Sequence, residues 1–309
     1  MASVSPQLIR ELRERTAAGM TDCKNALVEA EGDIEKAVEI ILKKGKAKSA
    51  KRATAAAAEG AIRAVLSEDA RVGTLVEINV QTDFAARDDM FKKFVEEVAQ
   101  LTAGVDTLEV LLATRMASGK TVAESRDDLI ATIGEKIDVR RMERLALSSA
   151  SGCIHSYVHM NGKIGVLLAT EAENETVAAH EAFLKFVDDT SMQIAAMSPI
   201  YLDSSQVPAA DIEKQREIAA EQLKTEGKPE AAWPKIVEGK VAKWYTDICL
   251  VDQNSVIENG KSVDEVRAEA AKAAGGSIKL LAFIRYQLGE GVKINEENFA
   301  EEAMKMAES

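Results

Sequence analysis

Hydrophobic positions recur at helical spacing through the first 55 residues of the chain. Three such stripes follow residues that favour helix caps, namely Ser5, then Thr21 or Asp22, then Asp33. The apolar positions of the stripes are Leu8, Ile9 and Leu12, then Ala26 and Leu27, then Ile34, Ala37, Val38, Ile41 and Leu42. The pattern predicts three short helices that form a compact module.

Beyond residue 55, strand-like and amphipathic stretches alternate, and their order occurs twice. Three blocks match: Gly60-Ala-Ile-Arg-Ala-Val-Leu66 with Gly152-Cys-Ile-His-Ser-Tyr-Val158, Arg71-Val-Gly-Thr-Leu-Val76 with Lys163-Ile-Gly-Val-Leu-Leu168, and Phe91-Lys-Lys-Phe-Val-Glu-Glu97 with Phe183-Leu-Lys-Phe-Val-Asp-Asp189. The offset is 92 residues each time, from 60 to 152, from 71 to 163 and from 91 to 183. The chain therefore contains two copies of one unit, each predicted as strand, turn, strand, loop and helix.

Residues 199–247 depart from this repeat. Two helical stripes flank Gly227-Lys-Pro229, which favours an antiparallel helical hairpin. The second stripe contains Trp233, Ile236, Val237, Val241 and Trp244. This is more apolar surface than one partner helix needs, so we expect either packing on the core or, preferably, a homodimer through the hairpin.

These patterns predict a helix-rich α+β protein of several units. Residues 122–135 are helical in pattern and end near Gly134, and strand character follows at Ile137 and returns at Ile248 to Val251 and at Ile278 to Tyr286. The predicted divisions are a three-helix domain with a basic linker (1–55), a first core lobe (56–145), a second core lobe (146–197 and 248–288), an inserted coiled-coil hairpin (199–247) and a C-terminal helical module (289–309). A length of 309 residues exceeds the usual limit of about 250 for one hydrophobic core.

The charge distribution limits the possible partners. A net charge of -12 argues against general binding of nucleic acids, which requires clustered Lys and Arg. Residues 1–55 nevertheless carry eleven basic and eight acidic side chains, and six of the ten residues from Lys43 to Arg52 are basic. An RNA-binding arm is one interpretation of this segment; we expect a solvated linker, because no aromatic residue interleaves for base stacking.

Cysteine usage and hydropathy indicate a cytoplasmic protein. Cys23, Cys153 and Cys249 show no Cys-x-x-Cys spacing, which disfavours a disulfide framework and a zinc site. No apolar run of about 18 residues is present, and the N-terminus lacks the pattern of a secretory signal. We therefore expect no contact with a membrane.

Residue patterns typical of catalysis are missing. Ser118-Gly-Lys-Thr121 is similar to the end of a phosphate-binding loop, but Thr114 stands where that loop requires glycine. The alternative of a phosphate-handling enzyme rests on this segment alone, and we expect a solvated turn. His155 and His159 have no Glu or Cys at ligand spacing. The prediction is a binding protein that is not an enzyme and has no cofactor or metal.

The two copies differ in the loop after their second strand. Gln81-Thr-Asp-Phe84 in the first copy stands opposite Glu173-Asn-Glu-Thr176 in the second. In one interpretation Thr82 or Asp83 caps the next helix and Phe84 packs beneath it. In the other, Phe84 is exposed and anchors a partner.

Five ordered motifs resemble the elongation factor Ts family, and they span essentially the whole chain. They are Leu12-Arg-Glu-Arg-Thr-Ala-Ala-Gly-Met20 with Asp22-Cys-Lys24, Val80-Gln-Thr-Asp-Phe84, Ile133-Gly-Glu135 with Arg140-Arg141, Ser156-Tyr-Val-His159, and Phe283-Ile-Arg-Tyr-Gln-Leu-Gly-Glu-Gly291. The resemblance implies a ubiquitin-associated-like N-terminal domain, a two-lobed core, an inserted coiled-coil hairpin and a C-terminal helical module.

The resemblance also implies a function. Members of this family bind elongation factor Tu carrying GDP, and they catalyse GDP release by disturbing its magnesium and phosphate site, so that GTP can load. Asp83 and Phe84 are implied to reach that site, with Phe84 in an apolar pocket. The other contacts to elongation factor Tu that the resemblance implies are Thr82, Ile133, Gly134, His159 and Lys24.

Overall fold

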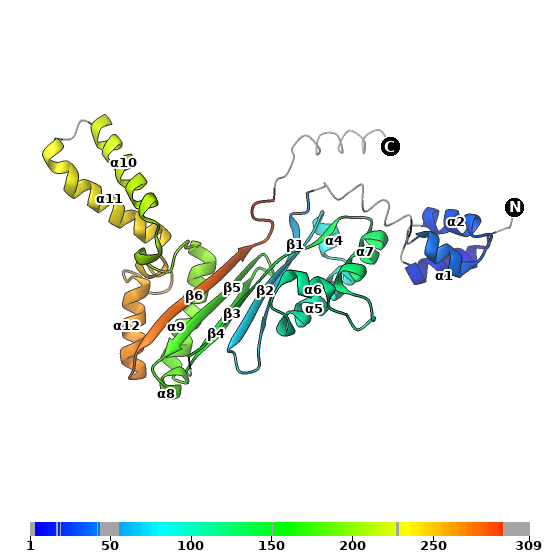
Figure 1. Cartoon of the computed structure of the whole chain (residues 1–309), viewed down its shortest axis with the longest axis horizontal. Helices are drawn as coiled ribbons and strands as arrows, with labels where there is room; N and C mark the ends of the chain where they lie inside the picture. Colours follow the sequence, from blue (N-terminus) through cyan, green and yellow to red (C-terminus); the bar gives the residue numbers. More distant parts are fainter. Residues whose placement is uncertain are drawn as a thin grey trace.

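The computed structural model describes residues 4–292, except 17, 19, 42, 44–55, 150, 227 and 228. Helices and two three-stranded antiparallel sheets make up this part of the chain, so the predicted mixture of helix and sheet is confirmed. Figure 1 shows the sheets at the centre, a group of short helices at one end and a helical hairpin at the other. No helix among the described residues is long and apolar enough to span a membrane.

The first sheet has the order β1-β2-β3 and is covered by helices on one face. Its strands are β1 (Glu59–Leu66), β2 (Val72–Val80) and β3 (Ile137–Ala146). The helices are α4 (Asp83–Ala86), α5 (Asp89–Leu101), α6 (Leu108–Ala113) and α7 (Val122–Ile133), with a short 3-10 turn at Thr102–Gly104. Phe91, Val95 and Val98 of α5 are buried against Val76 and Ile78 of β2, which forms the core of the first lobe.

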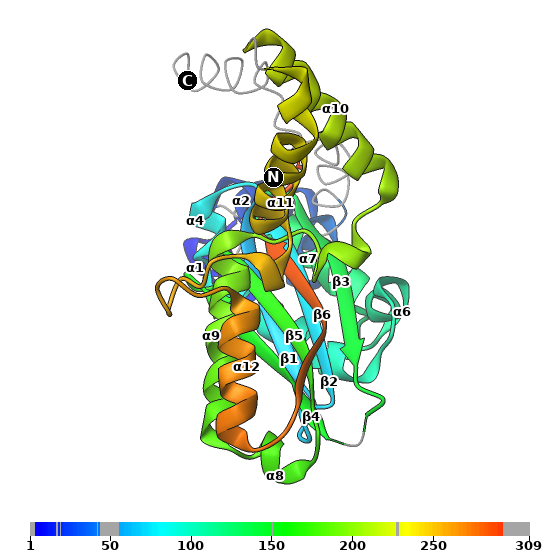
Figure 2. The same ribbon diagram turned by 90° about the vertical axis from the view of Figure 1, so that its left-hand side faces the viewer.

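The second sheet repeats this arrangement with the order β4-β5-β6. Its strands are β4 (Gly152–His159), β5 (Ile164–Ala172) and β6 (Ile278–Gln287), and its helices are α8 (Glu175–Ala178), α9 (Glu181–Met197) and α12 (Val263–Ala274). Figure 2 shows α9 and α12 side by side over this sheet. The order strand, turn, strand, loop and helix predicted for each copy is therefore confirmed.

The uncovered faces of the two sheets pack against each other. Ile62 and Leu75 of the first sheet share a buried cluster with Ile154 and Leu167 of the second, and each pair is 92 positions apart. The backbone N–H of Ile62 donates to the Gly162 carbonyl at 2.8 Å, and the N–H of Ile154 donates to the Ala70 carbonyl at 2.7 Å. Because the same contacts are made in both directions, the two copies are related by an approximate two-fold rotation.

The repeat extends beyond the blocks visible in the sequence, but with a larger offset. Thr121 and Ser262 both form a capping box at the start of a helix, and Gly134 and Gly275 both end that helix in the left-handed conformation. These pairs are 141 positions apart, compared with 92 for the earlier blocks. The difference of 49 equals the length of segment 199–247. The hairpin is therefore an insertion into the second copy.

The hairpin consists of α10 (Ala209–Thr225) and α11 (Trp233–Ile248), and residues 227 and 228 of its predicted turn lie outside the described part. The strand predicted at Ile248 to Val251 is wrong. Ile248 ends α11 and Leu250–Asp252 is a 3-10 turn, because Cys249 pairs only through a single bridge with Tyr201. This bridge closes the root of the hairpin.

The apolar stripe of α11 is partly covered by the chain itself. Val241 is 4 % exposed, and Ala219 and Leu223 of α10 are buried as well. Trp244 packs at the hairpin root against Ile248. The surface left for a second copy is consequently smaller than the sequence suggested, and it contains the half-buried Val237.

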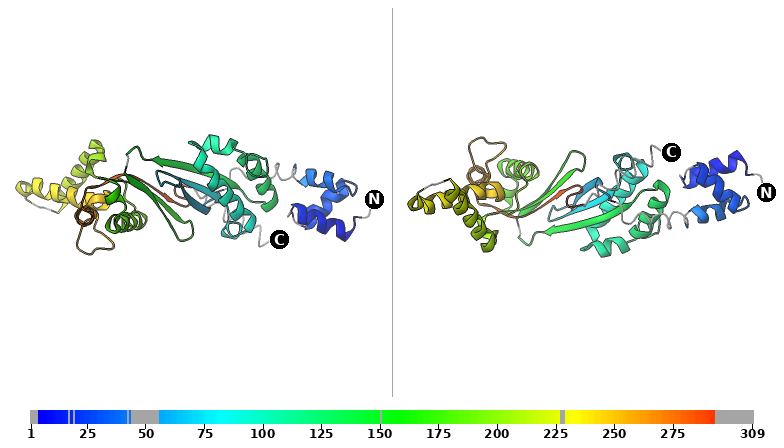
Figure 3. Two further views of the ribbon diagram at one scale, coloured as in Figure 1. Left: turned by 90° about the horizontal axis from the view of Figure 1, so that it is seen from below. Right: turned by 90° about the horizontal axis from the view of Figure 1, so that it is seen from above.

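The three predicted N-terminal helices are present. They are α1 (Pro6–Thr16), α2 (Met20–Glu29) and a helical stretch at 34–41. Leu12, Cys23 and Leu27 are buried at their centre. Figure 3 shows this group and the hairpin at opposite ends of the molecule. Most of the predicted basic linker, and residues 293–309 of the predicted C-terminal module, lie outside the described residues.

Candidate partner-binding surface

The loop that distinguishes the two copies forms a single helical turn, α4. Thr82 is its N-cap, and the Thr82 Oγ1 accepts a hydrogen bond from the Ala85 N–H at 3.2 Å. Ala85 is the residue of α4 that is buried, whereas Phe84 is 80 % exposed. The capping role predicted for Thr82 is confirmed. Of the two interpretations of Phe84, the one that packs it beneath the helix is wrong and the exposed position is confirmed, because a turn of this length buries one face and Phe84 lies on the other.

Glu135 clamps this turn from the neighbouring helix end. Its Oε2 accepts from the Thr82 N–H at 3.0 Å, and its Oε1 accepts from the Thr82 hydroxyl at 2.8 Å. A further bond runs from the Lys136 N–H to the Gln81 Oε1 at 2.8 Å. Hydrogen bonds to a charged carboxylate are stronger than neutral ones, so the turn that carries Phe84 is held rigidly.

The position of Glu135 depends on how α7 ends. Gly134 has φ 82° and closes the helix, with its N–H bonded to the Ile130 carbonyl at 2.9 Å. A left-handed residue here reverses the chain, which brings Glu135 to Thr82. Ile133 packs at the edge of the first-lobe core. Ile133 and Gly134 thus directly precede the residue that binds the Phe84 turn.

Asp83 faces a groove that also reaches the second lobe. Asp83 forms an ion pair with Arg87 at 2.8 Å; the Arg87 side chain is exposed and that of Asp83 is half-buried. The groove has a volume of about 400 Å³, and its lining includes Asp83 and Arg87 on one side and Met160, Asn161 and Lys163 on the other. The β4–β5 turn is therefore a neighbour of α4, although the two segments are far apart in sequence.

His159 lies at the exposed end of β4, immediately before that turn. Its Nδ1 is 2.8 Å from the Tyr157 hydroxyl, and the two rings stack with centroids 5.8 Å apart. The stacking orients the imidazole at the surface. The exposed side chains of this region that a partner could contact include His159, Met160 and Phe84.

Lys24 is exposed on α2, in the separate N-terminal group of helices. The six other predicted contact residues lie on the core: Thr82, Asp83, Phe84, Ile133, Gly134 and His159. We call the core set, together with Met160, the candidate surface.

Sequence reasoning did not assign Glu135 and Arg87 to the site. Glu135 is separated from Thr82 by 53 positions, so no local pattern links the two residues. The one available signal was the motif Ile133-Gly-Glu135, in which the glutamate directly follows a helix-ending glycine. Arg87 was detectable from its position four residues after Asp83 on a helical turn.

The segment that is similar to a phosphate loop has a different role. The Thr121 hydroxyl accepts from the Glu124 N–H at 3.1 Å and begins α7, and Lys120 forms an ion pair with Asp128. The backbone amides at the start of this helix are therefore bonded to the chain's own side chains. His155 is occupied similarly, since its Nδ1 lies 3.1 Å from the Ser191 hydroxyl.

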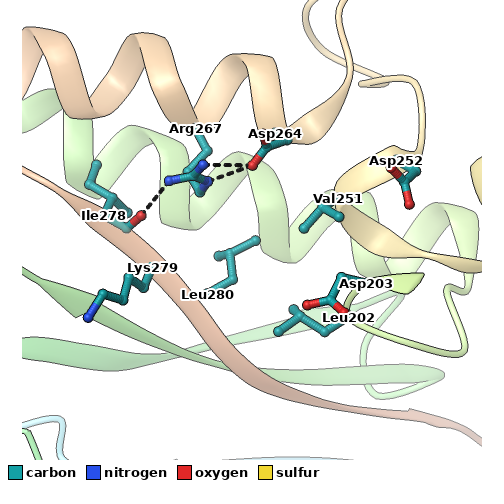
Figure 4. A pocket seen from close by; sticks show the side chains of 9 residues that line it. All are labelled: Leu202, Asp203, Val251, Asp252, Asp264, Arg267, Ile278, Lys279 and Leu280. Carbon is teal, nitrogen blue, oxygen red and sulfur yellow. Dashed lines mark hydrogen bonds and ion pairs between the residues drawn. The ribbon is translucent and has the colours of Figure 1, made fainter. Parts of the chain in front are cut away.

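A second cavity, of about 490 Å³, lies between α12, β6 and the hairpin root (Figure 4). Arg267 spans it by donating to Asp264 at 2.8 Å and to the Ile278 carbonyl at 2.7 Å. Burial, and then the nearby carboxylates Asp203 and Asp264, raise the pKa of Asp252. Among the described residues, no group of His, Cys, Asp and Glu has the geometry of a metal site.

Comparison with known proteins identifies one family for this chain. The sequence profile of the family described as Elongation factor TS matches residues 81–290. The chain is similar to elongation factor Ts of a Nitratiruptor species, with 46% identity over 97% of this chain and 98% of the relative. It is 43% identical to elongation factor Ts of a Type A strain of Clostridium perfringens, over 98% of this chain and 99% of the relative. The chain therefore belongs to the elongation factor Ts family.

Proposed function

We propose that this protein is a guanine-nucleotide exchange factor for elongation factor Tu. It binds elongation factor Tu carrying GDP and speeds GDP release, which allows GTP to load. The observation that carries this proposal is the 80 % exposed Phe84 on a turn that Glu135 holds in place. An aromatic side chain kept in water by a rigid turn is suited to insertion into a pocket of another protein.

The proposed mechanism requires no catalytic group in this chain. Magnesium and the phosphate contacts hold a nucleotide in its binding loop, so a wedge that displaces their surroundings weakens nucleotide binding. Phe84 supplies the apolar part of the wedge, and the neighbouring Asp83 supplies a carboxylate beside it. The coupling between the two binding reactions is reciprocal: the factor weakens GDP binding by the same amount as nucleotide weakens binding of the factor. Nucleotide can therefore release the factor, which then acts again.

The direct test is release of labelled GDP from elongation factor Tu by catalytic amounts of this protein. We expect faster release, and we expect this chain alone neither to bind nor to hydrolyse GTP. Unchanged GDP release would contradict the exchange function. Hydrolysis by the isolated chain would instead support the phosphate-handling alternative centred on Lys120.

The N-terminal helices are proposed to be a separable, ubiquitin-associated-like docking domain. They have their own buried core around Leu12 and Leu27, and Lys24 is exposed on their surface. A chain that begins at Ala56 should stay folded but bind elongation factor Tu more weakly. The control is Lys24→Ala in the full chain. Affinity within about twofold of wild type for both variants would exclude a contact role.

The hairpin is proposed to mediate a homodimer. A shallow, mainly apolar groove lies between the two helices, and its lining includes Arg216, Ala220, Trp233, Pro234 and Val237. Val237→Lys should shift sedimentation from dimer toward monomer while GDP release is unchanged. Val241 is unsuitable for this test, because it is buried within the hairpin and its substitution would damage the hairpin itself. A wild-type protein that sediments as a monomer would exclude the dimer.

The remaining parts of the proposal concern location and other partners. We propose that the protein acts in the cytoplasm, where translation takes place, without a cofactor and without direct contact to nucleic acid or membrane. Retention of RNA that falls steeply with salt concentration would instead favour the RNA-arm interpretation of the segment from Lys43 to Arg52.

A further inference from the structure

Glu77 is a completely buried carboxylate in the middle of β2. Its Oε2 accepts from Arg141 Nε at 2.6 Å, and its Oε1 accepts from Arg140 Nη1 at 2.9 Å. The same Oε1 also accepts from the Asn79 side chain at 3.0 Å and from the Gly289 N–H at 2.8 Å. Burial alone would raise the pKa of Glu77, but the hydrogen bonds outweigh it and the pKa is lowered, so the group is charged near neutral pH.

A β-bulge explains how two consecutive arginines reach one carboxylate. Side chains normally alternate between the faces of a strand. Here the pairing of β2 with β3 shifts between Glu77 and Ile78: Glu77 faces Arg141, Ile78 faces Val139, and Arg140 is the extra residue. The bulge turns both guanidinium groups toward Glu77.

The second copy has the same bulge without the charges. Ala169, which corresponds to Glu77, is followed by the register shift in the pairing of β5 with β6. The residues that correspond to Arg140 and Arg141 are Leu281 and Ala282. The bulge therefore forms with Ala, Leu and Ala at these positions. The charges of the first copy are not required for the fold of the strand pair, which indicates another role.

Glu77, Arg140 and Arg141 form a charged cluster that also binds groups beyond the first sheet, and these groups suggest the other role. The Arg141 guanidinium lies 4.0 Å from the centroid of the buried Tyr286 ring and donates to the Gln287 carbonyl at 3.1 Å. Arg140 donates to the Glu290 carbonyl. Together with the bond from Gly289 to Glu77, these contacts attach the end of β6 and the turn after it to the first lobe.

The same turn is bonded to the segment that carries His159. The N–H of Leu288 donates to the Lys163 carbonyl at 2.9 Å, and the N–H of Ile62 donates to the Gly162 carbonyl at 2.8 Å. On the other side, β2 continues from Glu77 to the Phe84 turn within a few residues. Glu77 thus lies on a short path of bonded groups between the two halves of the candidate surface.

We propose that Glu77, with Arg140 and Arg141, is a positioning residue that fixes the 159–163 turn relative to the Phe84 turn, so that both bind the partner as one rigid surface. This inference rests on the proposed exchange function. Stability alone does not account for the cluster, since replacing a buried ion pair by apolar residues is often neutral or stabilising. A fixed geometry lowers the ordering cost of binding at two separated points.

The first test transplants the apolar trio of the second copy. The variant Glu77→Ala/Arg140→Leu/Arg141→Ala should stay folded with a lowered melting temperature, because the Gly289 N–H loses its acceptor. It should accelerate GDP release about tenfold less than the wild type does. The matched control is Lys279→Ala, which breaks an exposed ion pair with Glu171 on the second sheet, and it should leave exchange unchanged. Full exchange in the triple variant would overturn the proposal.

The second test measures coupling, which a purely structural role would not change. His159→Ala should weaken binding to elongation factor Tu in the wild type, and its effect should fall to less than about half in the triple-variant background. Equal effects in both backgrounds, or no effect in the wild type, would overturn the proposal. Wild-type protein that fails to release GDP would instead refute the proposed function.

A third variant covers the case in which the triple variant does not fold. Gly289 has φ 72°, and an added Cβ would lie 2.5 Å from the Ala58 carbonyl oxygen. Gly289→Ala should therefore displace the turn after β6 while all charges remain. We expect the same loss of exchange and the same reduced effect of His159→Ala. Normal exchange in this folded variant would overturn the proposal.

Discussion

Replacing Phe84 by Ala tests the candidate surface most directly. In the free protein this side chain is 80 % exposed, so its removal costs little burial and should hardly change the thermal midpoint. In a complex, burying a phenylalanine contributes about 1.5 to 3 kcal/mol. Since about 1.4 kcal/mol corresponds to a factor of ten, Phe84→Ala should weaken binding and slow catalysed GDP release about tenfold to a hundredfold.

The assay needs two matched controls. Leu184 is 52 % exposed on α9, and Leu184→Ala should leave both exchange and stability unchanged. Phe91 is 1 % exposed in the first-lobe core, and Phe91→Ala should cost about 3 to 5 kcal/mol of unfolding free energy. If Phe84→Ala behaves like the Leu184 variant in exchange, or like the Phe91 variant in stability, the reasoning about an exposed anchor is refuted.

Three further predictions follow from the contacts of single side chains. Glu135→Ala should slow exchange severalfold with only a small change in melting temperature, because it frees the turn at Thr82 without opening the core; wild-type exchange rates would contradict this. Below pH 4.5, the ordinary glutamate pKa, the unfolding free energy should fall more steeply for wild type than for Glu77→Gln. A carboxylate with a lowered pKa stabilises the folded state fully above its ordinary pKa, and this stabilisation is lost as the pH falls and the carboxylate protonates. Parallel acid titrations of the two proteins would contradict this. Burial and then the nearby Asp252 and Asp203 raise the pKa of Cys249 to about 11. At pH 8 this thiol should therefore resist labelling until the protein unfolds, and mass spectrometry of labelled peptides can check this.

Much of the fold was predictable from local patterns. Spacing and caps within a few residues of each other predict the three N-terminal helices and the helix that ends at Gly134. The two copies follow from blocks of sequence that recur at a constant offset of 92 residues. The strand predicted at Ile248 to Val251 failed because an apolar run of this length fits a buried helix end as well as a strand.

The candidate site was predictable only in part. The comparison of the two copies identified Phe84 but left its exposure open, because exposure depends on whether Ala85 or Phe84 faces the core. The clamp by Glu135 and the cluster around Glu77 join residues from distant segments. The bulge that turns Arg140 and Arg141 to one side also interrupts the alternation on which strand prediction depends.

The closed root of the inserted hairpin has a consequence for how this core can vary. The N–H groups of Ile200 and Tyr201 both donate to the Ile248 carbonyl, at 2.8 and 3.0 Å, so the two ends of the insertion meet. In the first copy the two positions equivalent to the ends of the insertion are Asp106 and Thr107, which are adjacent in the chain. Leu202 of the insertion is buried in the core of the second lobe and has to stay. Since the closure cost of a loop grows only slowly with its length, a short turn could replace α10 and most of α11 without disturbing the sheets. The junction is thus a natural attachment point at which evolution or engineering can exchange one appendage for another while the Phe84 turn stays in place.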